Sequence, residues 1–267
     1  MARDDTTPAQ IELRNVSKTF SDSEGRVAWT AVEDVSFAVR PGEIVGLLGP
    51  SGCGKSTLLS IVAGLDGVFA GDCRIEGRPV AERLNTGFRV AYVFQESRLL
   101  PWKTVRQNIE FVLRAAGIER AEWRARIDRV LARVELLDFA DFYPRELSGG
   151  MQQRASIARA FAIEPDVLLL DEPFSALDEL TARRLRQALL ELWADFRTTV
   201  LFVSHNALES TFLGDRILIM SPGPAGRIRD TIDLSHLPRP RSYDDTVLFE
   251  ASKRVVASMR QHVGDLD

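Results

Sequence analysis

The chain has 267 residues, of which 45% are hydrophobic, and this is enough apolar side chain for one large domain with a sizeable core. Its formal net charge of −4 gives no support for a face that binds nucleic acid. No apolar run approaches the roughly 20 residues that span a bilayer, and the polar start at Met1 to Asp5 predicts no signal peptide.

Two segments with alternating apolar residues follow an N-terminal tail, residues 1–9, that we expect to be loose. The period of two around Ile11–Val16 and again around Val35–Val39 predicts half-buried antiparallel strands. A short apolar strand at 43–48 then leads into a glycine-rich loop.

This loop, residues 49–56, reads Gly-Pro-Ser-Gly-Cys-Gly-Lys-Ser and fits the phosphate-loop pattern G-x-x-x-x-G-K-[ST] at every fixed position. Its glycines let backbone N–H groups close around phosphate oxygens, and a helix expected at 56–65 adds its positive N-terminal end. Lys55 is expected to reach the β- and γ-phosphates, and the Ser56 hydroxyl to ligate Mg²⁺. The Cys53 thiol, near this helix N-terminus, is expected to be reactive and to be protected by MgATP, whereas MgATP is expected to give Cys73 no protection. The predicted nucleotide contacts are Gly49, Pro50, Ser51, Gly52, Cys53, Gly54, Lys55, Ser56 and Thr57.

Residues from about 97 to 149 change character, because apolar residues recur there with helical spacing and the remaining faces are densely charged. We expect a helical insertion between strands of an α/β core. The other core elements are expected as strands at 89–94, 167–170, 199–203 and 216–220, and a helix near 181–196. Pro238 and Pro240 indicate a separate C-terminal segment, which we assign to residues 233–267. Within it, a helix is predicted at 247–259.

Polar residues follow three of these strands. Asp171 and Glu172 end an apolar strand, where carboxylates would otherwise be costly to bury, and Asp171 is expected to hold Mg²⁺. The alternative is an acidic pair that caps a helix. Gln95 and His205 follow two other strands, and the alternatives are that Gln95 is a surface residue and that His205, like most lone histidines, is structural. Since open α/β sheets bind ligands at the carboxyl ends of their strands, position favours a functional role for His205.

Residues 147–154 read Leu-Ser-Gly-Gly-Met-Gln-Gln-Arg and open a helix predicted at 151–161. Together with the phosphate loop and the strand that ends in Asp171-Glu172, in this order, they resemble the ATP-binding-cassette (ABC) ATPases, in which the octapeptide is the family signature. A phosphate-loop kinase would not need it. The resemblance covers about residues 11–232, and implies an ABC ATPase domain over 10–232. The implied fold is α/β, a RecA-like phosphate-loop core with an antiparallel β subdomain and an inserted α-helical subdomain.

The resemblance also implies the cofactors ATP and Mg²⁺ and a set of catalytic roles. By this resemblance Glu172 polarises the attacking water, and Gln95 contacts both Mg²⁺ and that water. His205 holds the γ-phosphate and orients Glu172. Phe20 stacks on adenine, with Trp29 as a rival for that place.

A second copy of the chain is implied as a partner in a head-to-tail dimer. Each signature, with Ser148, Gly149 and Gly150, would close on the ATP of the partner, and Asp178 would communicate across the interface. Ser148 can also be a simple helix N-cap, and both roles can hold at once.

Residues 93–102 read Val-Phe-Gln-Glu-Ser-Arg-Leu-Leu-Pro-Trp and are similar to the nitrate, sulfonate and taurine branch of bacterial ABC importers. That resemblance implies an ATPase at the cytoplasmic face of the membrane, held there by transmembrane permease subunits and served by a separate solute-binding protein. Leu99, Leu100 and Trp102 are expected to form an exposed apolar cleft for a short permease helix; the alternative is that they pack inside the helical insertion.

Two other functions share most of these features. An ABC exporter or lipid transporter would have the same catalytic residues, so only residues 94–102 argue against it. A non-transport ABC ATPase acting on DNA or ribosomes would usually show duplicated cassettes, long insertions or basic arms, none of which is evident in the sequence.

Overall fold

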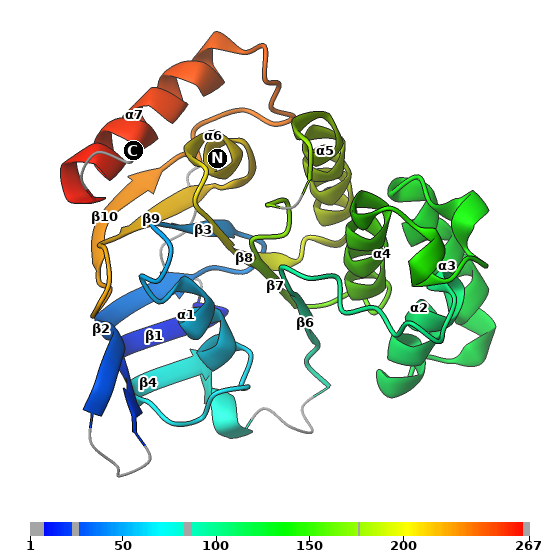
Figure 1. Cartoon of the computed structure of the whole chain (residues 1–267), viewed down its shortest axis with the longest axis horizontal. Coiled ribbons are helices and arrows are strands. Elements are labelled where there is room, and N and C mark those ends of the chain that lie inside the picture. The colour runs from blue at the N-terminus through cyan, green and yellow to red at the C-terminus, as the bar shows by residue number, and fades with distance from the viewer. Residues whose placement is uncertain (1–7, 23–26, 83–86, 176, 264–267) are drawn as a thin grey trace. The chain divides into compact units, whose positions relative to one another are not determined.

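The computed structural model of the chain describes residues 8–22, 27–82, 87–175 and 177–263 (Figure 1). These residues belong to two compact units, one within Met1–Thr86 and Thr199–Asp267 and the other within Gly87–Thr198. The C-terminal segment thus belongs to the same unit as the phosphate loop. Among the described residues, no helix combines the length and the apolar character needed to cross a membrane.

The first unit begins with an antiparallel sheet whose strand order is β2, β1, β4, β5. Strand β1 pairs antiparallel with both β2 and β4, as its alternating sequence predicts. Ile11, Leu13 and Val16 are buried on one face of β1. The strands are β1 (Ile11–Ser21), β2 (Val27–Val39), β4 (Ala70–Ile75) and β5 (Arg78–Pro79), followed by a short 3₁₀ turn, η1 (Val80–Glu82).

A second set of strands in this unit carries the phosphate loop. Strand β3 pairs in parallel with β8 on one side and β9 on the other, and β10 is antiparallel to β9. The strands are β3 (Ile44–Leu48), β8 (Thr199–Ser204), β9 (Arg216–Met220) and β10 (Ile228–Asp233), and the helices are α1 (Lys55–Val62), α6 (Ala207–Leu213) and α7 (Thr246–Val263). Helix α7, longer than predicted, packs on α6, β9 and β10 (Figure 1).

The second unit combines a parallel strand pair with helices. Strands β6 (Val90–Val93) and β7 (Val167–Asp171) run in parallel. Its helical elements are α2 (Val105–Ala115), α3 (Arg120–Arg133), η2 (Leu137–Phe139), η3 (Pro144–Glu146), α4 (Gly149–Phe161) and α5 (Glu179–Phe196). The predicted fold class is therefore confirmed: an α/β core, an antiparallel β portion and a helical stretch.

Candidate nucleotide-binding site

The loop between β3 and α1 is shaped by two glycines with a left-handed backbone. Gly52 has a φ of 78° and Gly54 a φ of 94°, a region that L side chains rarely adopt. A Cβ on Gly54 would also stand 2.3 Å from Cγ1 of Val32, so only glycine fits there. Gly54 is the N-cap of α1 and provides no side-chain cap for its first turn. An anion can take the place of that cap, as at other helix N-termini.

Lys55 lies inside this loop rather than in solvent. Its side chain is only 5% exposed, and Nζ donates hydrogen bonds of 2.8 Å to the carbonyl oxygens of Gly49 and Pro50. These contacts hold an ammonium group within the loop, where it would neutralise phosphate charge.

The expectation of an accessible thiol at Cys53 is wrong. The Cys53 side chain is fully buried, and its Sγ lies 3.9 Å from Nζ of Lys55. Cys73 is buried as well. The Cys53 Sγ would lie 3.0 Å from a Cβ on Gly49, so Cys53 packs against the start of the loop.

His205 lies at the same strand edge as the phosphate loop. Strands β3 and β8 pair in parallel with Leu48 opposite Ser204, so Gly49 and His205 each follow one member of that pair. The His205 side chain is exposed. Helix α6 begins directly after it: Asn206 caps the helix by accepting a 3.0 Å hydrogen bond from the backbone N–H of Glu209, and its own N–H donates to Oγ of Ser204 at 2.9 Å.

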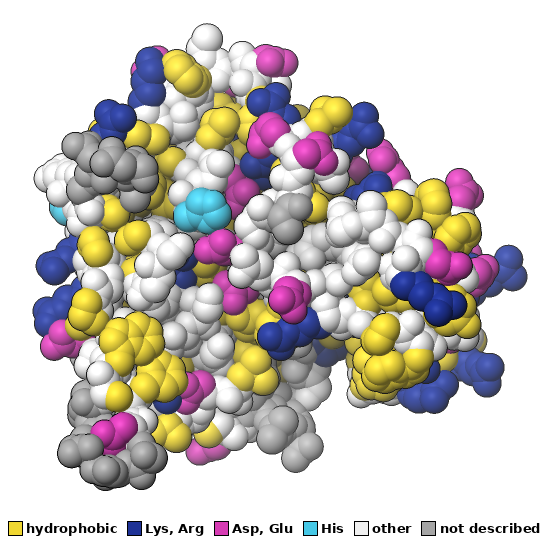
Figure 2. Space-filling model, in the orientation of Figure 1, with side chains coloured by type: hydrophobic (Ala, Val, Ile, Leu, Met, Phe, Trp, Pro, Cys, Tyr) yellow, Lys and Arg dark blue, Asp and Glu magenta, His cyan; other side chains and the backbone are white. Residues whose placement is uncertain are grey.

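Phe20 and Trp29 form an exposed aromatic pair. They face each other across β1 and β2, their rings stack with centroids 5.5 Å apart and planes 14° apart, and each is 40% exposed. Hydrophobic side chains gather at the surface over these strands (Figure 2). The pair is a flat apolar surface of the kind on which a purine can stack. The two aromatic residues considered from the sequence as alternatives are thus neighbours.

A cation accompanies this pair. Nζ of Lys18 lies 4.8 Å from the centroid of the Phe20 ring and forms a 2.8 Å ion pair with Asp66. Burial raises the pKa of Asp66, but the hydrogen bond from Lys18, the backbone N–H of Val68 and the charge of Lys18 outweigh burial, so the pKa lies below its ordinary value.

The loop between β9 and β10 packs against the phosphate loop. Its backbone is fixed to β2, since the N–H of Ala225 donates to the carbonyl of Thr30 at 2.8 Å and the N–H of Gly226 to that of Ala31 at 3.0 Å. A Cβ on Gly223 would stand only 2.6 Å from the carbonyl oxygen of Gly52. The Gly-Pro-rich sequence at 221–226 marks a loop, but nothing in it indicates this contact.

In the second unit, β6 and β7 end at the same edge, with Val93 opposite Leu170. Asp171 accepts a 3.0 Å hydrogen bond from the Tyr92 hydroxyl, which orients its carboxylate. The structure therefore supports the strand-end placement of the acidic pair and adds Tyr92, whose role no sequence signal indicated.

Gln95 and Glu172 are joined through one serine hydroxyl. Nε2 of Gln95 donates to Oγ of Ser175 at 3.3 Å, and that hydroxyl donates to the carbonyl oxygen of Glu172 at 3.0 Å. Glu172 has a φ of 44°, in the left-handed region that is costly for a residue with a Cβ.

The signature octapeptide opens α4 in the predicted manner. Ser148 is the N-cap, and its Oγ accepts a 3.3 Å hydrogen bond from the N–H of Met151. Ser148 and Gly149 are exposed, and a Cβ on Gly149 would meet nothing within 4 Å. The start of this helix is therefore uncovered at the protein surface, where a phosphate from another molecule can approach.

Asp178 caps α5 in the same way, with Oδ1 accepting a 3.0 Å hydrogen bond from the N–H of Thr181. The hydrogen bonds from Thr181 lower the pKa of the Asp178 carboxyl, which stays ionised at neutral pH. The capping roles of Ser148 and Asp178 are therefore present in a single chain.

One further residue ties the signature helix to the Gln95 strand end. Nε2 of Gln153 donates a 3.2 Å hydrogen bond to the carbonyl oxygen of Phe94, and the Gln153 side chain is buried. Gln153 belongs to the octapeptide, but its spacing alone does not indicate this contact.

Oxygen-donor side chains of the kind that Mg²⁺ prefers occur in each of the two units. Ser56, Gln95 and Asp171 supply hydroxyl, amide and carboxylate oxygens. Within the described ranges, no three His, Cys, Asp or Glu side chains gather to form a metal cage.

The Leu99–Trp102 turn differs from expectation in one respect. Leu99 is buried, Leu100 is half-buried and Trp102 is 69% exposed, so only part of the predicted cleft faces solvent. Asn108 fixes the turn: its Oδ1 accepts from the N–H of Leu100 at 2.7 Å, and its Nδ2 donates to the carbonyls of Leu100, Lys103 and Thr104 at 3.0 to 3.2 Å. Leu99 packs inward because the turn folds back on α2.

Comparison with known proteins agrees with these features. The family model described as ABC transporter matches residues 32–175. The chain is 42% identical over 238 residues to the aliphatic sulfonates import ATP-binding protein SsuB of Bacillus subtilis (strain 168), covering 89% of this chain and 90% of that protein. It is 41% identical over 234 residues to the nitrate import ATP-binding protein NrtD of Synechococcus elongatus, covering 87% of this chain and 83% of the relative.

Solved structures show the same fold. An ATP-binding cassette determined as a dimer in a post-hydrolysis state, bound to ADP and Pi, matches with a TM-score of 0.73 and 32% identity, over 84% of this chain and 98% of that one. The ATP-binding subunit of an ABC transporter matches with a TM-score of 0.74 and 26% identity, over 92% of this chain and 99% of the other.

Proposed function

The chain belongs to the ABC transporter family, and we propose that two copies of it drive an importer for nitrate, a sulfonate, taurine or a similar small solute. It binds and hydrolyses ATP as the ATP-binding subunit of that importer. The similarity to sulfonate and nitrate import proteins, over nearly the whole length of both, supports import over export.

The phosphate loop and its strand neighbour bind the nucleotide in this proposal. Lys55 neutralises the β- and γ-phosphates, and the backbone N–H groups of Gly49 and of residues 51–57 close around them. His205, which follows the strand paired with β3, contacts the γ-phosphate. Adenine stacks on the surface formed by Phe20 and Trp29.

Glu172 activates the water that attacks the γ-phosphate. Gln95 and Asp171 hold Mg²⁺ together with Ser56, and the ion would neutralise charge on the phosphate oxygens when bound. The observation that carries the hydrolytic role is a hydrogen-bonded link directly after β7, in which Gln95 donates to the Ser175 hydroxyl and that hydroxyl donates to the backbone carbonyl of Glu172. This chain of hydrogen bonds fixes the position of Glu172, the proposed base, relative to Gln95, a proposed Mg²⁺ ligand.

The dimer supplies the rest of the site. The exposed start of α4, with Ser148, Gly149 and Gly150, contacts the γ-phosphate bound by the partner, and Asp178 lies at the same interface. A helix N-terminus without a covering element is suited to an anion from another molecule. The related cassette solved as a dimer with ADP and Pi supports this assembly.

The permease contacts the turn at Leu99–Trp102. Trp102 and Phe111 of α2 are 69% and 53% exposed, and exposed aromatic residues of this size mark interaction surfaces. A short helix of a membrane subunit would lie against them, place the ATPase at the cytoplasmic face of the membrane and transmit closure of the dimer. A separate solute-binding protein would deliver the solute to the permease.

Replacement of Glu172 by Gln tests the hydrolytic role. The variant keeps size and hydrogen bonding but loses the basic carboxylate, so we expect ATP hydrolysis to fall by about 100-fold or more while ATP still binds. With ATP the variant should accumulate as a dimer, measured as a doubling of mass by light scattering. Turnover close to that of the natural chain would contradict the assignment.

The direction of solute movement across proteoliposomes that contain the co-purified permease separates import from export. With the ATPase and MgATP outside, an importer moves solute that was enclosed with its binding protein out of the lumen. Movement of solute from the ATPase side into the lumen would identify an exporter instead.

A further inference from the structure

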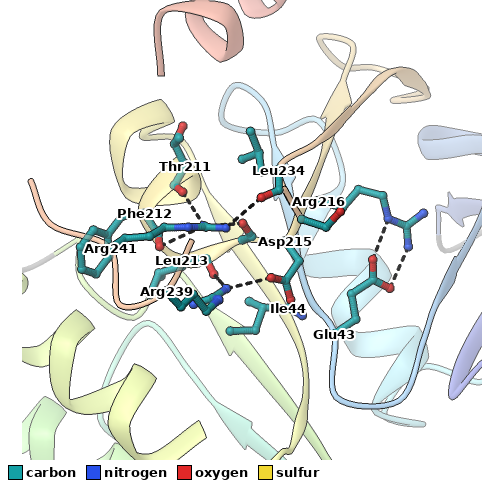
Figure 3. A network of polar contacts seen from close by, with 12 residues as sticks. Glu43, Ile44, Thr211, Phe212, Leu213, Asp215, Arg216, Leu234, Arg239 and Arg241 are labelled. Carbon is teal, nitrogen blue, oxygen red and sulfur yellow. Dashed lines mark hydrogen bonds and ion pairs between the residues drawn. The ribbon is translucent and has the colours of Figure 1, made fainter. Parts of the chain in front are cut away.

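Two buried arginines join the C-terminal segment to helix α6. Arg241 is only 4% exposed and Arg239 is largely covered, and both lie at the carboxyl end of this helix (Figure 3). They come from the Pro-Arg-Pro-Arg run that the sequence sets between the last strand and α7. Neither contributes to the nucleotide site described above.

The two arginines donate hydrogen bonds to the last three carbonyl groups of α6. The final four carbonyls of a helix have no partner within the helix. Here the Ser210 carbonyl accepts from the N–H of Gly214 at 2.8 Å. Nη1 of Arg241 donates to the carbonyls of Thr211 at 2.8 Å, Phe212 at 3.2 Å and Gly214 at 2.6 Å, and Nη2 of Arg239 donates to that of Leu213 at 2.6 Å. Every one of the four is satisfied.

The charges at this helix end are arranged to hold it. Positive charge at a helix carboxyl end interacts favourably with the helix dipole. Asp215, which is 3% exposed, accepts from Arg239 at 3.1 Å and from the N–H of Ile44 at 3.0 Å, so it ties the helix end to the first residue of β3. Burial and the neighbouring charge of Arg239, partly offset by Asp215, lower the pKa of Arg241 to about 10, which leaves it charged at neutral pH.

Further contacts link the same segment to the helix. Nη2 of Arg241 donates to the carbonyl of Leu234 at 3.0 Å, which fixes the start of the segment. The ring of Tyr243 stacks on Phe212 of α6 with centroids 4.3 Å apart and planes only 4° apart. Helix α6 is thus clamped at its carboxyl end by side chains from residues 239–243.

The amino end of α6 lies next to His205, the residue proposed to contact the γ-phosphate. The helix has seven residues and begins at Ala207, two positions after His205, so a tilt of its carboxyl end moves His205 as well. We propose that Arg239 and Arg241 are positioning residues for His205 and act through α6. The C-terminal segment is accordingly a part of the catalytic unit rather than an appendage. This inference rests on the proposed contact of His205 with the γ-phosphate.

Hydrolysis of MgATP by the purified full-length chain tests this. Arg241→Met keeps most of the side-chain volume and removes all its hydrogen bonds, and Arg241→Lys keeps the charge without the fork of donors. We expect kcat to fall by about tenfold or more in Arg241→Met, with a smaller fall in Arg241→Lys and little change in the KM for MgATP. Arg254→Met, at an exposed position of α7, is the matched control and should be normal.

A double-mutant cycle with His205→Ala separates positioning from general stability. If Arg241 acts through His205, then Arg241→Met should cause no further loss of kcat in the His205→Ala chain. An equal loss in both backgrounds would overturn the inference and leave Arg241 a purely structural residue. Normal hydrolysis by His205→Ala itself would refute the proposed function of His205 and the inference with it. If Arg241→Met does not fold, the same cycle with Arg241→Lys decides.

Discussion

Gly226 lies directly against the carbonyl group of Cys53, so closely that a Cβ on Gly226 would stand 2.0 Å from that oxygen and 3.0 Å from the carbonyl carbon. The contact joins the loop after β9 to the centre of the phosphate loop. Neither side can yield easily, because the Gly226 N–H donates to Ala31 and its carbonyl accepts from the N–H of Glu33. The shape of the phosphate loop therefore depends on a residue more than 170 positions away.

Replacement of Gly226 by Ala should weaken nucleotide binding. The added methyl group overlaps backbone, so the phosphate loop must shift, at a cost of about 1–3 kcal/mol for overpacking of this kind. We expect ATP and ADP affinity, measured by calorimetric titration, to fall by about tenfold, which is the equivalent of about 1.4 kcal/mol. Gly67→Ala is the control, since a Cβ there meets nothing within 4 Å. Unchanged affinity in Gly226→Ala would show that the loop tolerates displacement.

The thiols of Cys53 and Cys73 should not react with maleimide in the folded protein. Cys53 and Cys73 are both buried, with exposed fractions of 0% and 2%. Maleimide treatment of the native chain should therefore label neither, with or without MgATP, and denaturant should make both reactive. Mass spectrometry of the intact chain counts the labels. Rapid native labelling of Cys53 would mean that the phosphate loop opens often.

Ser148→Arg should act on the dimer and leave the monomer intact. The side chain is exposed at the start of α4, so a larger residue costs little stability, apart from about 1 kcal/mol for the lost N-cap. In a Glu172→Gln background, we expect ATP-dependent doubling of mass to disappear while calorimetric ATP affinity of the monomer stays normal. A collapse of monomer affinity with an unchanged circular dichroism spectrum would place the signature at the chain's own nucleotide.

Trp102→Ala should impair assembly and spare nucleotide chemistry. Most of this side chain faces solvent, so its removal should leave the melting temperature and the ATP affinity of the isolated subunit nearly unchanged. Co-purification with the permease should fall sharply, because large aromatic residues dominate binding at interfaces. Val247→Ala, exposed on α7, provides the control. Normal assembly of Trp102→Ala would move the docking surface elsewhere.

The sequence predicted the parts of the fold that local pattern determines. Strong apolar runs such as Val167–Leu170 and helical spacing over residues 105–134 are independent of their surroundings. Strands β4 and β10 were not predicted, because Ala-Gly-Asp-Cys-Arg-Ile and Ile-Arg-Asp-Thr-Ile-Asp are too polar and become strands only by pairing with β1 and β9.

The same distinction applies to the site. Residues within contiguous motifs or at strand ends, such as Lys55 and Glu172, can be predicted because their positions follow from the chain direction. Contacts between segments distant in sequence, such as those of Gly226 and Arg241, depend on tertiary packing and have no local signal. The burial of Leu99 and Cys53 was mispredicted for this reason.

The Asn108 side chain fixes the backbone of the turn at Leu99–Trp102. Asn108 lies on α2, is 1% exposed and hydrogen-bonds to backbone groups of the turn at Leu100, Lys103 and Thr104, and its Oδ1 also accepts from Nη1 of Arg159 at 3.4 Å. The hydrogen bonds from Asn108 to the turn thus involve backbone atoms and not the side chains of residues 100–103. If Trp102 contacts the permease as proposed, such an exposed position can change together with a permease without a loss of folding. Related importers in one cell could in this way keep their ATPase subunits from exchanging.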